Sequence, residues 1–109
     1  MKRATGRAVV TTFFRVCDAG RTNAPVSWAD HQMYVWVPNT RTWHRERELE
    51  IDYLIERKLT FEPLPASDVP AAMDAAQRVD ERSAGWLIDE YRAQPPEDRR
   101  SSADLGVRI

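Results

Sequence analysis

Apolar and polar positions along much of the chain follow a pattern that is typical of short strands. Three segments rich in β-branched and aromatic residues predict strands, namely residues 8–17, 33–37 and 59–62. The second segment ends at Pro38 and the third at Pro63. Residues 38–41 predict a β-turn, and residues 26–31 predict a further short strand or a turn.

Residues 43–58 allow two interpretations. The alternation over residues 48–53 is typical of a strand, but Leu54 and Ile55 break it. Two sets of residues instead recur at helical spacing, namely Ile51, Leu54, Ile55 and Lys58, and Leu49 with Tyr53. The segment is rich in good helix formers and lacks glycine and proline. We therefore predict a helix over residues 44–57, with Thr42 as its N-cap.

A third pattern predicts a long helix over residues 67–92. Ser67 is a suitable N-cap, and Pro70 lies in the first turn, where its missing N–H costs no hydrogen bond. The apolar residues at helical spacing are Val69, Ala72, Met73, Ala76, Val79, Trp86, Leu87 and Tyr91. A continuous helix of this length would measure roughly 39 Å, whereas a strand of five to eight residues spans roughly 17–27 Å. We therefore expect the helix to extend beyond the sheet or to bend near Gly85.

Together these elements predict an α+β domain over residues 1–93. It would contain a small, mainly antiparallel sheet of three or four strands, with the two helices packed on one face. The predicted core consists of Val9, Val10, Phe13, Val16, Val35, Val37, Leu54, Phe61, Met73, Ala76 and Leu87. Residues 94–109 are rich in proline, serine and charge before a short apolar tag, Leu105–Ile109, so we expect a flexible charged tail there.

Composition limits the class of protein. The chain has 109 residues, of which 42% are hydrophobic and 30% charged, as in an ordinary globular domain. No apolar run approaches the roughly 18–20 residues of a membrane span, and the basic N-terminus lacks the apolar region of a signal peptide. Cys17 is the only cysteine, which excludes an intrachain disulfide and a metal site built from several cysteines. We therefore expect a cytoplasmic domain with no membrane association, metal or other cofactor.

Charge is distributed unevenly, although the net charge is only −1. Residues 1–47 carry eight basic and three acidic side chains, residues 48–98 carry five and thirteen, and residues 99–109 carry three and one. Both signs can belong to solvated faces of one domain, but the basic part could also bind nucleic acid or an acidic protein. Nucleic acid is the weaker of these hypotheses because the chain contains no recognition motif.

Two histidines supply the residues for an enzymatic hypothesis. His31 and His44, with Arg45, could act as base, acid and phosphate-binding cation in a small metal-independent ribonuclease or toxin. This hypothesis requires both rings and an arginine to lie within about 8 Å of one another in one cleft. The four glycines are scattered, which argues against Walker-type and dinucleotide-binding loops.

Aromatic residues support the other hypothesis, a small module that binds a protein. The chain contains four tryptophans, and tryptophan is enriched at the energetic centres of protein interfaces. Trp43 lies beside a polar turn and a charged run, so we expect it to be exposed. The end of the predicted long helix would present Trp86, Leu87 and Tyr91 as an apolar patch. We expect these four residues to contact a partner, either another protein or a second copy of the chain.

One further pattern is Trp43-His44, Leu49, Asp52-Tyr53-Leu54 and Leu59-Thr60-Phe61-Glu62-Pro63. It resembles that of a group of short actinobacterial proteins with no known activity. The resemblance covers about residues 33–65 and implies no role for any residue. The small size, the lack of catalytic motifs, the uneven charge, the long amphipathic helix and the apolar tag favour a different basis for function. From them we infer a non-enzymatic binding or regulatory module that acts through another protein, such as an accessory factor or an antitoxin- or immunity-like inhibitor.

Overall fold

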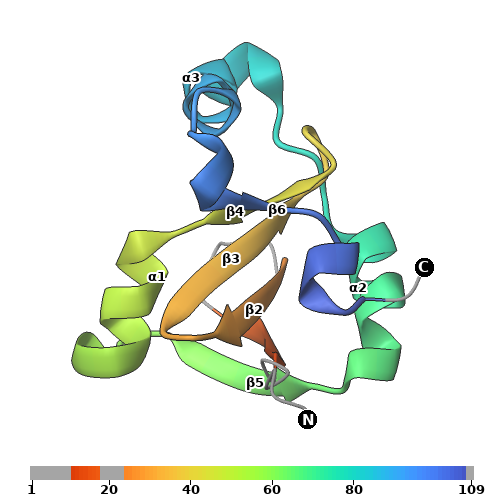
Figure 1. The fold of residues 1–109 in the computed structure, drawn as a ribbon. Helices are drawn as coiled ribbons and strands as arrows, with labels where there is room; N and C mark the ends of the chain where they lie inside the picture. The colour runs from red at the N-terminus through yellow and green to blue at the C-terminus, as the bar shows by residue number, and fades with distance from the viewer. Residues whose placement is uncertain (1–10, 18–23, 108–109) are drawn as a thin grey trace, which may run out of the picture.

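The computed structural model describes residues 11–17 and 24–107. In these ranges six strands form one antiparallel sheet in the order β5-β1-β2-β3-β4-β6 (Figure 1). The strands are β1 (Thr12–Cys17), β2 (Pro25–Ala29), β3 (Gln32–Val37), β4 (Thr42–Arg45), β5 (Thr60–Leu64) and β6 (Arg99–Arg100). The α+β class and the antiparallel sheet are confirmed, but the sheet has more strands than the predicted three or four.

Three α-helices accompany the sheet in the described part of the chain. They are α1 (Arg47–Ile51), which continues as the π-helix η1 (Asp52–Glu56), α2 (Val69–Ala75) and α3 (Glu81–Arg92). Short 3₁₀ turns are formed by η2 (Ala66–Asp68), η3 (Pro96–Asp98) and η4 (Ala103–Leu105). None of the helices within the described ranges is long and apolar enough to cross a membrane.

Two tight turns set the register of the central strands. Asp30 and His31 adopt positive φ angles of 53° and 63° between β2 and β3, as a two-residue turn of mirror-image type requires. The predicted turn at residues 38–41 joins β3 to β4, and Arg41 there has a φ of 54°. Residues 26–31, which were predicted as a strand or a turn, therefore contain both: most of β2, followed by the turn.

The sheet separates two small cores, so the prediction that both helices cover one face is wrong. One core packs α2 and η4 on the sheet and contains Phe13, Tyr34, Trp36, Trp43, Leu64, Val69, Ala72, Met73, Leu105 and Val107. The other packs α1 and η1 on the opposite face and contains Phe14, Val26 and Met33, with Val16, Trp28, Val35, Leu49, Tyr53 and Phe61 at its margin. Side chains alternate between faces along each strand, so apolar residues on both faces require a cover on each.

The helix predicted over residues 44–57 begins later, at Arg47. Trp43 and His44 belong to β4, where their side chains are buried on opposite faces of the sheet, and this alternation is possible only in a strand. Glu46, rather than Thr42, is the N-cap of α1. The helix turns its Leu49 and Tyr53 side to the sheet. Ile51, Leu54 and Ile55 are consequently exposed, which contradicts the predicted core position of Leu54.

The helix predicted over residues 67–92 is two helices with an extended link, and the second of them is kinked at Ala84, where φ is −134° and ψ is 31°, so the predicted bend near Gly85 is present as well as the earlier break. Helix α2 ends at Ala75, and α3 begins at Glu81. Asn39 holds the link, because its side-chain amide accepts from the Val79 N–H at 2.8 Å and donates to the Val79 carbonyl at 2.9 Å. Asp80 then caps α3 by accepting from the Arg82 N–H at 3.0 Å.

The segment predicted as a flexible tail instead packs on the domain up to residue 107. Strand β6 pairs with β4 at the edge of the sheet, and Leu105 and Val107 are buried in the α2 core. The indole Nε1 of Trp43 donates to Ser102 Oγ at 3.0 Å. The described part of the apolar tag, residues 105–107, therefore contributes to the same core as Trp43.

The remaining core predictions have mixed outcomes. Phe13, Val37 and Met73 are buried as predicted, and four further residues pack at the margin of a core, namely Val16, Val35, Phe61 and Ala76. Leu87 is only half-buried and belongs to neither core. Val9 and Val10 lie outside the described residues.

Candidate functional site

Helix α3 exposes a tryptophan on one side and buries an isoleucine on the other. The Trp86 side chain is 64% exposed, whereas Ile88 is fully buried. Two residues correspond to a rotation of about 200° around a helix, so these side chains lie on opposite sides of α3. Tyr91, one turn after Ile88, stacks on the ring of His44 with 4.7 Å between centroids. The inner side of α3 is thus bound to the domain, and its outer side carries Trp86.

The start of α3 is tied to the tip of the β3–β4 hairpin. Asn39 donates to Glu81 Oε2 at 3.1 Å, in addition to its paired bonds with Val79. Glu81 in turn accepts from both terminal nitrogens of Arg92 at 3.2 and 3.5 Å. These bonds lower the pKa of Glu81, first through Asn39 and then through Arg92. They connect the two ends of α3 to each other and to the sheet.

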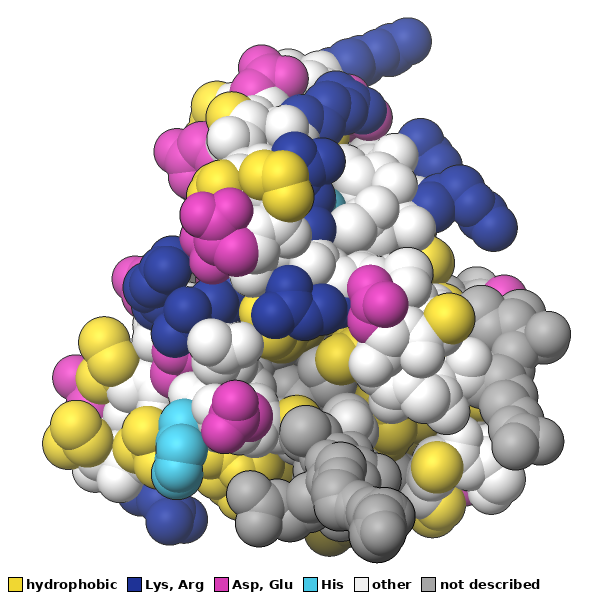
Figure 2. All heavy atoms as spheres, viewed as in Figure 1, with side chains coloured by type: hydrophobic (Ala, Val, Ile, Leu, Met, Phe, Trp, Pro, Cys, Tyr) yellow, Lys and Arg dark blue, Asp and Glu magenta, His cyan; other side chains and the backbone are white. Residues whose placement is uncertain are grey.

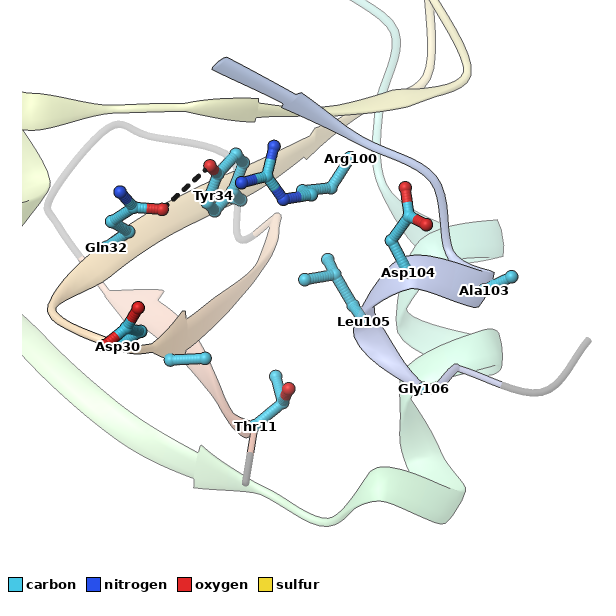
Figure 3. A pocket seen from close by; sticks show the side chains of 10 residues that line it. Thr11, Asp30, Gln32, Tyr34, Arg100, Ala103, Asp104, Leu105 and Gly106 are labelled. Atoms are coloured by element: carbon cyan, nitrogen blue, oxygen red, sulfur yellow. Dashed lines mark hydrogen bonds between the residues drawn. The ribbon is translucent and has the colours of Figure 1, made fainter. Parts of the chain in front are cut away.

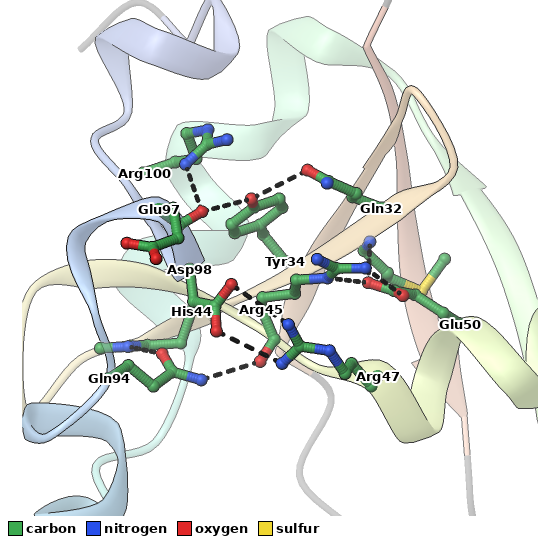
Figure 4. Close-up of polar contacts among 11 residues, drawn as sticks. Gln32, Tyr34, His44, Arg45, Arg47, Glu50, Gln94, Glu97, Asp98 and Arg100 are labelled. Atoms are coloured by element: carbon green, nitrogen blue, oxygen red, sulfur yellow. Dashed lines mark hydrogen bonds and ion pairs between the residues drawn. The ribbon is translucent and has the colours of Figure 1, made fainter.

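His44 lies beneath the end of α3, and both of its ring nitrogens are engaged. Nδ1 lies 2.7 Å from Gln94 Oε1, and Nε2 lies 2.7 Å from Thr40 Oγ1. Gln94 Nε2 donates to the Arg45 carbonyl at 3.0 Å, which makes Oε1 the acceptor of the Nδ1 proton (Figure 4). Burial lowers the pKa of His44, and nearby Arg99 lowers it further, against the opposing bond to Gln94. His44 is therefore a neutral structural residue with no nitrogen free for a substrate.

Two ion pairs beside His44 join β4, α1 and the segment after α3 (Figure 4). Glu50 accepts from Arg45 Nε at 2.8 Å and Nη2 at 3.0 Å, and also from the Met33 N–H at 2.9 Å. Arg47 donates to both oxygens of buried Asp98 at 3.3 and 3.4 Å. Arg45 is thus held by a bidentate carboxylate, and the bonds to Glu50 raise its pKa.

The residues of the ribonuclease hypothesis are not brought together. His31 lies in the exposed β2–β3 turn, with its ring 6.0 Å from that of Trp28. His44 pairs with Val35, four residues along β3 from His31, which corresponds to roughly 13 Å along the strand. Arg45 is bound to Glu50. The described structure therefore contains no cleft in which these three side chains meet.

The four residues predicted to contact a partner have different surroundings. Trp43 is fully buried in the α2 core, which contradicts its predicted exposure. Trp86 is exposed, Leu87 is half-buried, and Tyr91 is half-buried against His44. Trp86 and Leu87 therefore form the accessible part of the predicted patch, whereas Tyr91 packs against His44.

A second exposed apolar surface, on α1 and η1, was not predicted. Ile51, Leu54 and Ile55 are 49%, 52% and 75% exposed, and apolar side chains gather over α1 at the lower left of Figure 2. Helical spacing in the sequence did identify these residues as one face. It could not show that Leu49 and Tyr53, on the competing face, would be the ones to meet the sheet.

A polar hollow of about 480 Å³ lies between the β2–β3 turn and η4 (Figure 3). Tyr34 forms part of its wall; its hydroxyl donates to Gln32 Oε1 at 3.0 Å, and the Arg100 guanidinium lies 4.9 Å from its ring centre. Burial raises the pKa of Tyr34, so its hydroxyl stays protonated. Asp104 accepts from the Ser101 N–H at 3.0 Å, which lowers its pKa. Tyr34 and Asp104 are thus hydrogen-bonded to neighbouring residues, and Asp30 at the exposed β2–β3 turn is a second carboxylate that lines the hollow.

Cys17 and the acidic residues show no sign of covalent or metal chemistry. Burial and Glu62 raise the pKa of Cys17, which favours the unreactive thiol. No group of three or more histidine, cysteine, aspartate or glutamate side chains within the described ranges could hold a metal ion.

Comparison with known proteins adds no identification. No family model, curated protein or solved structure matches the chain. The site is therefore defined by its own geometry, in which the outer side of α3 is the most accessible aromatic surface of the described structure.

Proposed function

We propose that the protein is a non-enzymatic binding module that acts through another protein, and that its partner docks on the outer side of α3. The observation that carries this proposal is Trp86, which is 64% exposed while the same helix buries Ile88 completely. A large aromatic side chain gains free energy when a partner removes it from water. Tryptophan is also the residue type most enriched among the energetic centres of interfaces.

The bonds that attach α3 to the rest of the domain support this role. Asn39 fixes the link before the helix, the Glu81–Arg92 pair connects its two ends, and Tyr91 rests on His44. A partner would therefore meet Trp86 on a helix that is already ordered, and little conformational entropy would be lost on binding. Leu87, half-buried beside Trp86 in sequence, extends the contact. A module of this kind can act as an accessory factor or as an antitoxin- or immunity-like inhibitor.

The experiment compares partner recovery by Trp86→Ala with that by Ile55→Ala. Tagged wild type and both variants are incubated with lysate of the native host, and bound proteins are quantified by mass spectrometry. Ile55 is the matched control because it is also a large, exposed apolar residue but lies on η1. We expect Trp86→Ala to weaken binding of the recovered partner at least 30-fold, corresponding to about 2 kcal/mol, and Ile55→Ala to leave it unchanged.

The outcomes separate the alternatives. Equal recovery by wild type and Trp86→Ala would contradict the proposal, as would a loss confined to Ile55→Ala. Sedimentation velocity on the purified proteins identifies self-association, because a second copy as partner would make only Trp86→Ala monomeric at high concentration. Thermal unfolding is the control for structure, and Trp86→Ala should change stability by less than about 1 kcal/mol since the side chain is mostly exposed.

A further inference from the structure

A hollow of about 350 Å³ lies at the edge of the sheet, where β4 begins and β6 ends. It is lined by Arg41, Thr42, Pro96, Arg99, Arg100 and Ser101. The lining contains arginine and hydroxyl groups but no acidic residue. Its electrostatic character therefore differs from that of the hollow beside Tyr34, which Asp30 and Asp104 also line.

The pairing of β4 with β6 creates this basic surface. In the register His44 lies opposite Arg99 and Trp43 lies opposite Arg100. Alternation then places the Arg99 side chain on the His44 face and the Arg100 side chain on the Trp43 face. Arg41 comes from the basic first part of the sequence and Arg99 from the basic C-terminal part. The fold thus joins two cationic segments that are far apart in the chain.

Two guanidinium groups of this hollow retain free donors. Within the described residues, neither Arg41 nor Arg99 forms an ion pair. Arg99 uses one terminal nitrogen on the Gln94 carbonyl at 2.6 Å, and its buried Nε has no hydrogen-bond partner. Ser101 Oγ accepts from the Asp104 N–H at 3.1 Å, and its hydroxyl helps to lower the pKa of the Asp104 carboxylate, so its own proton is directed to Asp104 and not to the hollow. A hydrogen-bond acceptor bound in the hollow would satisfy the unpaired guanidinium N–H groups of Arg41 and Arg99.

Arg100 contributes to the wall differently. Its guanidinium lies over the Tyr34 ring and donates to the carbonyls of Glu97 and Arg99 at 2.9 and 2.8 Å. We therefore assign binding to Arg41 and Arg99, and not to Arg100 or Ser101.

We propose that this hollow binds a phosphate group. Guanidinium groups match phosphate oxygens with paired hydrogen bonds, and the tetrahedral oxygens of phosphate can accept from Arg41 and Arg99 in different directions. A planar carboxylate would satisfy fewer of these donors. The site does not include Trp86, so this proposal is tested independently of the proposed protein partner.

The experiment follows the ¹H–¹⁵N spectrum of the full chain during titration with inorganic phosphate at constant ionic strength. We expect saturable shifts of the amides of residues 41–42 and 99–101, with acetate producing no comparable shifts. Arg41→Asn should weaken binding about tenfold, the loss expected for one charged hydrogen-bonding group. This variant should fold well because asparagine tolerates the positive φ of residue 41. Arg99→Gln tests the second guanidinium.

Arg82→Gln is the matched control, since Arg82 is an exposed arginine on α3 outside the hollow. Unchanged affinity in both Arg41→Asn and Arg99→Gln, an equal loss in Arg82→Gln, or equal binding of acetate would overturn the proposal. A parallel titration with a short single-stranded oligonucleotide identifies the source of the phosphate. Binding of the oligonucleotide at least tenfold tighter than that of inorganic phosphate, lost in Arg41→Asn, would assign it to a nucleic acid; similar affinities would assign it to a small phosphorylated molecule.

Discussion

At the scale of single residues, the neutral imidazole of His44 makes stability depend on pH. Its pKa in the folded chain lies below its ordinary value of 6.5, so the unfolded chain binds more protons just below pH 6.5. The contribution of His44 to the free energy of unfolding should therefore be fully present above about pH 6.5. It should decrease as the pH falls from there towards the folded-state pKa. Urea unfolding at pH 7.5 and 5.5 measures this decrease.

His44→Gln provides the comparison for this pH effect. Glutamine has no proton to gain in this range, so the variant should lose less stability between the two pH values than the wild type does. The same pH dependence in both proteins would show that other groups cause it.

A second prediction concerns the carboxylate of Glu50. Glu50→Gln should lower the free energy of unfolding by about 2 kcal/mol, because it removes the charge that compensates the partly buried Arg45 guanidinium and weakens the bond from the Met33 N–H. Glu56→Gln is the control, because its contact with Lys58 spans 4.0 Å at the surface and should contribute less than about 0.5 kcal/mol. Similar effects of the two substitutions in urea unfolding would contradict this interpretation.

At the scale of elements, the C-terminal segment is part of the domain and should be needed for stability. Leu105 is buried among the residues of the α2 core. Leu105→Ala should therefore cost about 2–4 kcal/mol and lower the melting temperature by roughly 10 °C or more. Leu54→Ala, at a half-exposed leucine on η1, should cost less than about 1 kcal/mol. A melting temperature unaffected by Leu105→Ala would show that this segment does not stabilise the fold.

The elements also show what the sequence could predict. Local patterns identified β1, β3 and the turn at residues 38–41, because β-branched residues and proline act through their own backbone. They did not reveal β6, since Arg99 and Arg100 form a strand only because the edge of β4 is available to them. Helical spacing likewise offered two faces for α1, and the choice of Leu49 over Ile51 depends on how the helix leaves β4.

The same distinction applies to the candidate sites. The exposure of Trp86 could be inferred from the length of its helical pattern, although the helix is shorter than predicted. The burial of Trp43 could not be inferred from the sequence, because Trp43 is covered by a segment about sixty residues later that contains Ser102 and Leu105. The Arg41–Arg99 hollow equally requires a pairing between distant strands.

At the scale of the whole molecule, the two cores share one sheet, but its β6 edge pairs over fewer residues than its centre. Strand β6 contains only two residues, whereas β3 pairs on both sides with β2 and β4. We expect amides of β2 and β3 to exchange with solvent only on global unfolding, and those of β6 to exchange through smaller openings. Native-state hydrogen exchange measures this order, and protection of β6 equal to that of β3 would contradict it.

The two edges of the sheet have a consequence for how the protein behaves at high concentration. Pro63 lies within β5, where it lacks the N–H that an added strand would require. At the opposite edge, β6 is too short to template a long ladder and consists entirely of arginine. Short, charged or proline-containing edges discourage the strand addition from which fibrils grow. The protein can therefore keep an open six-stranded sheet without presenting either margin as a template for aggregation.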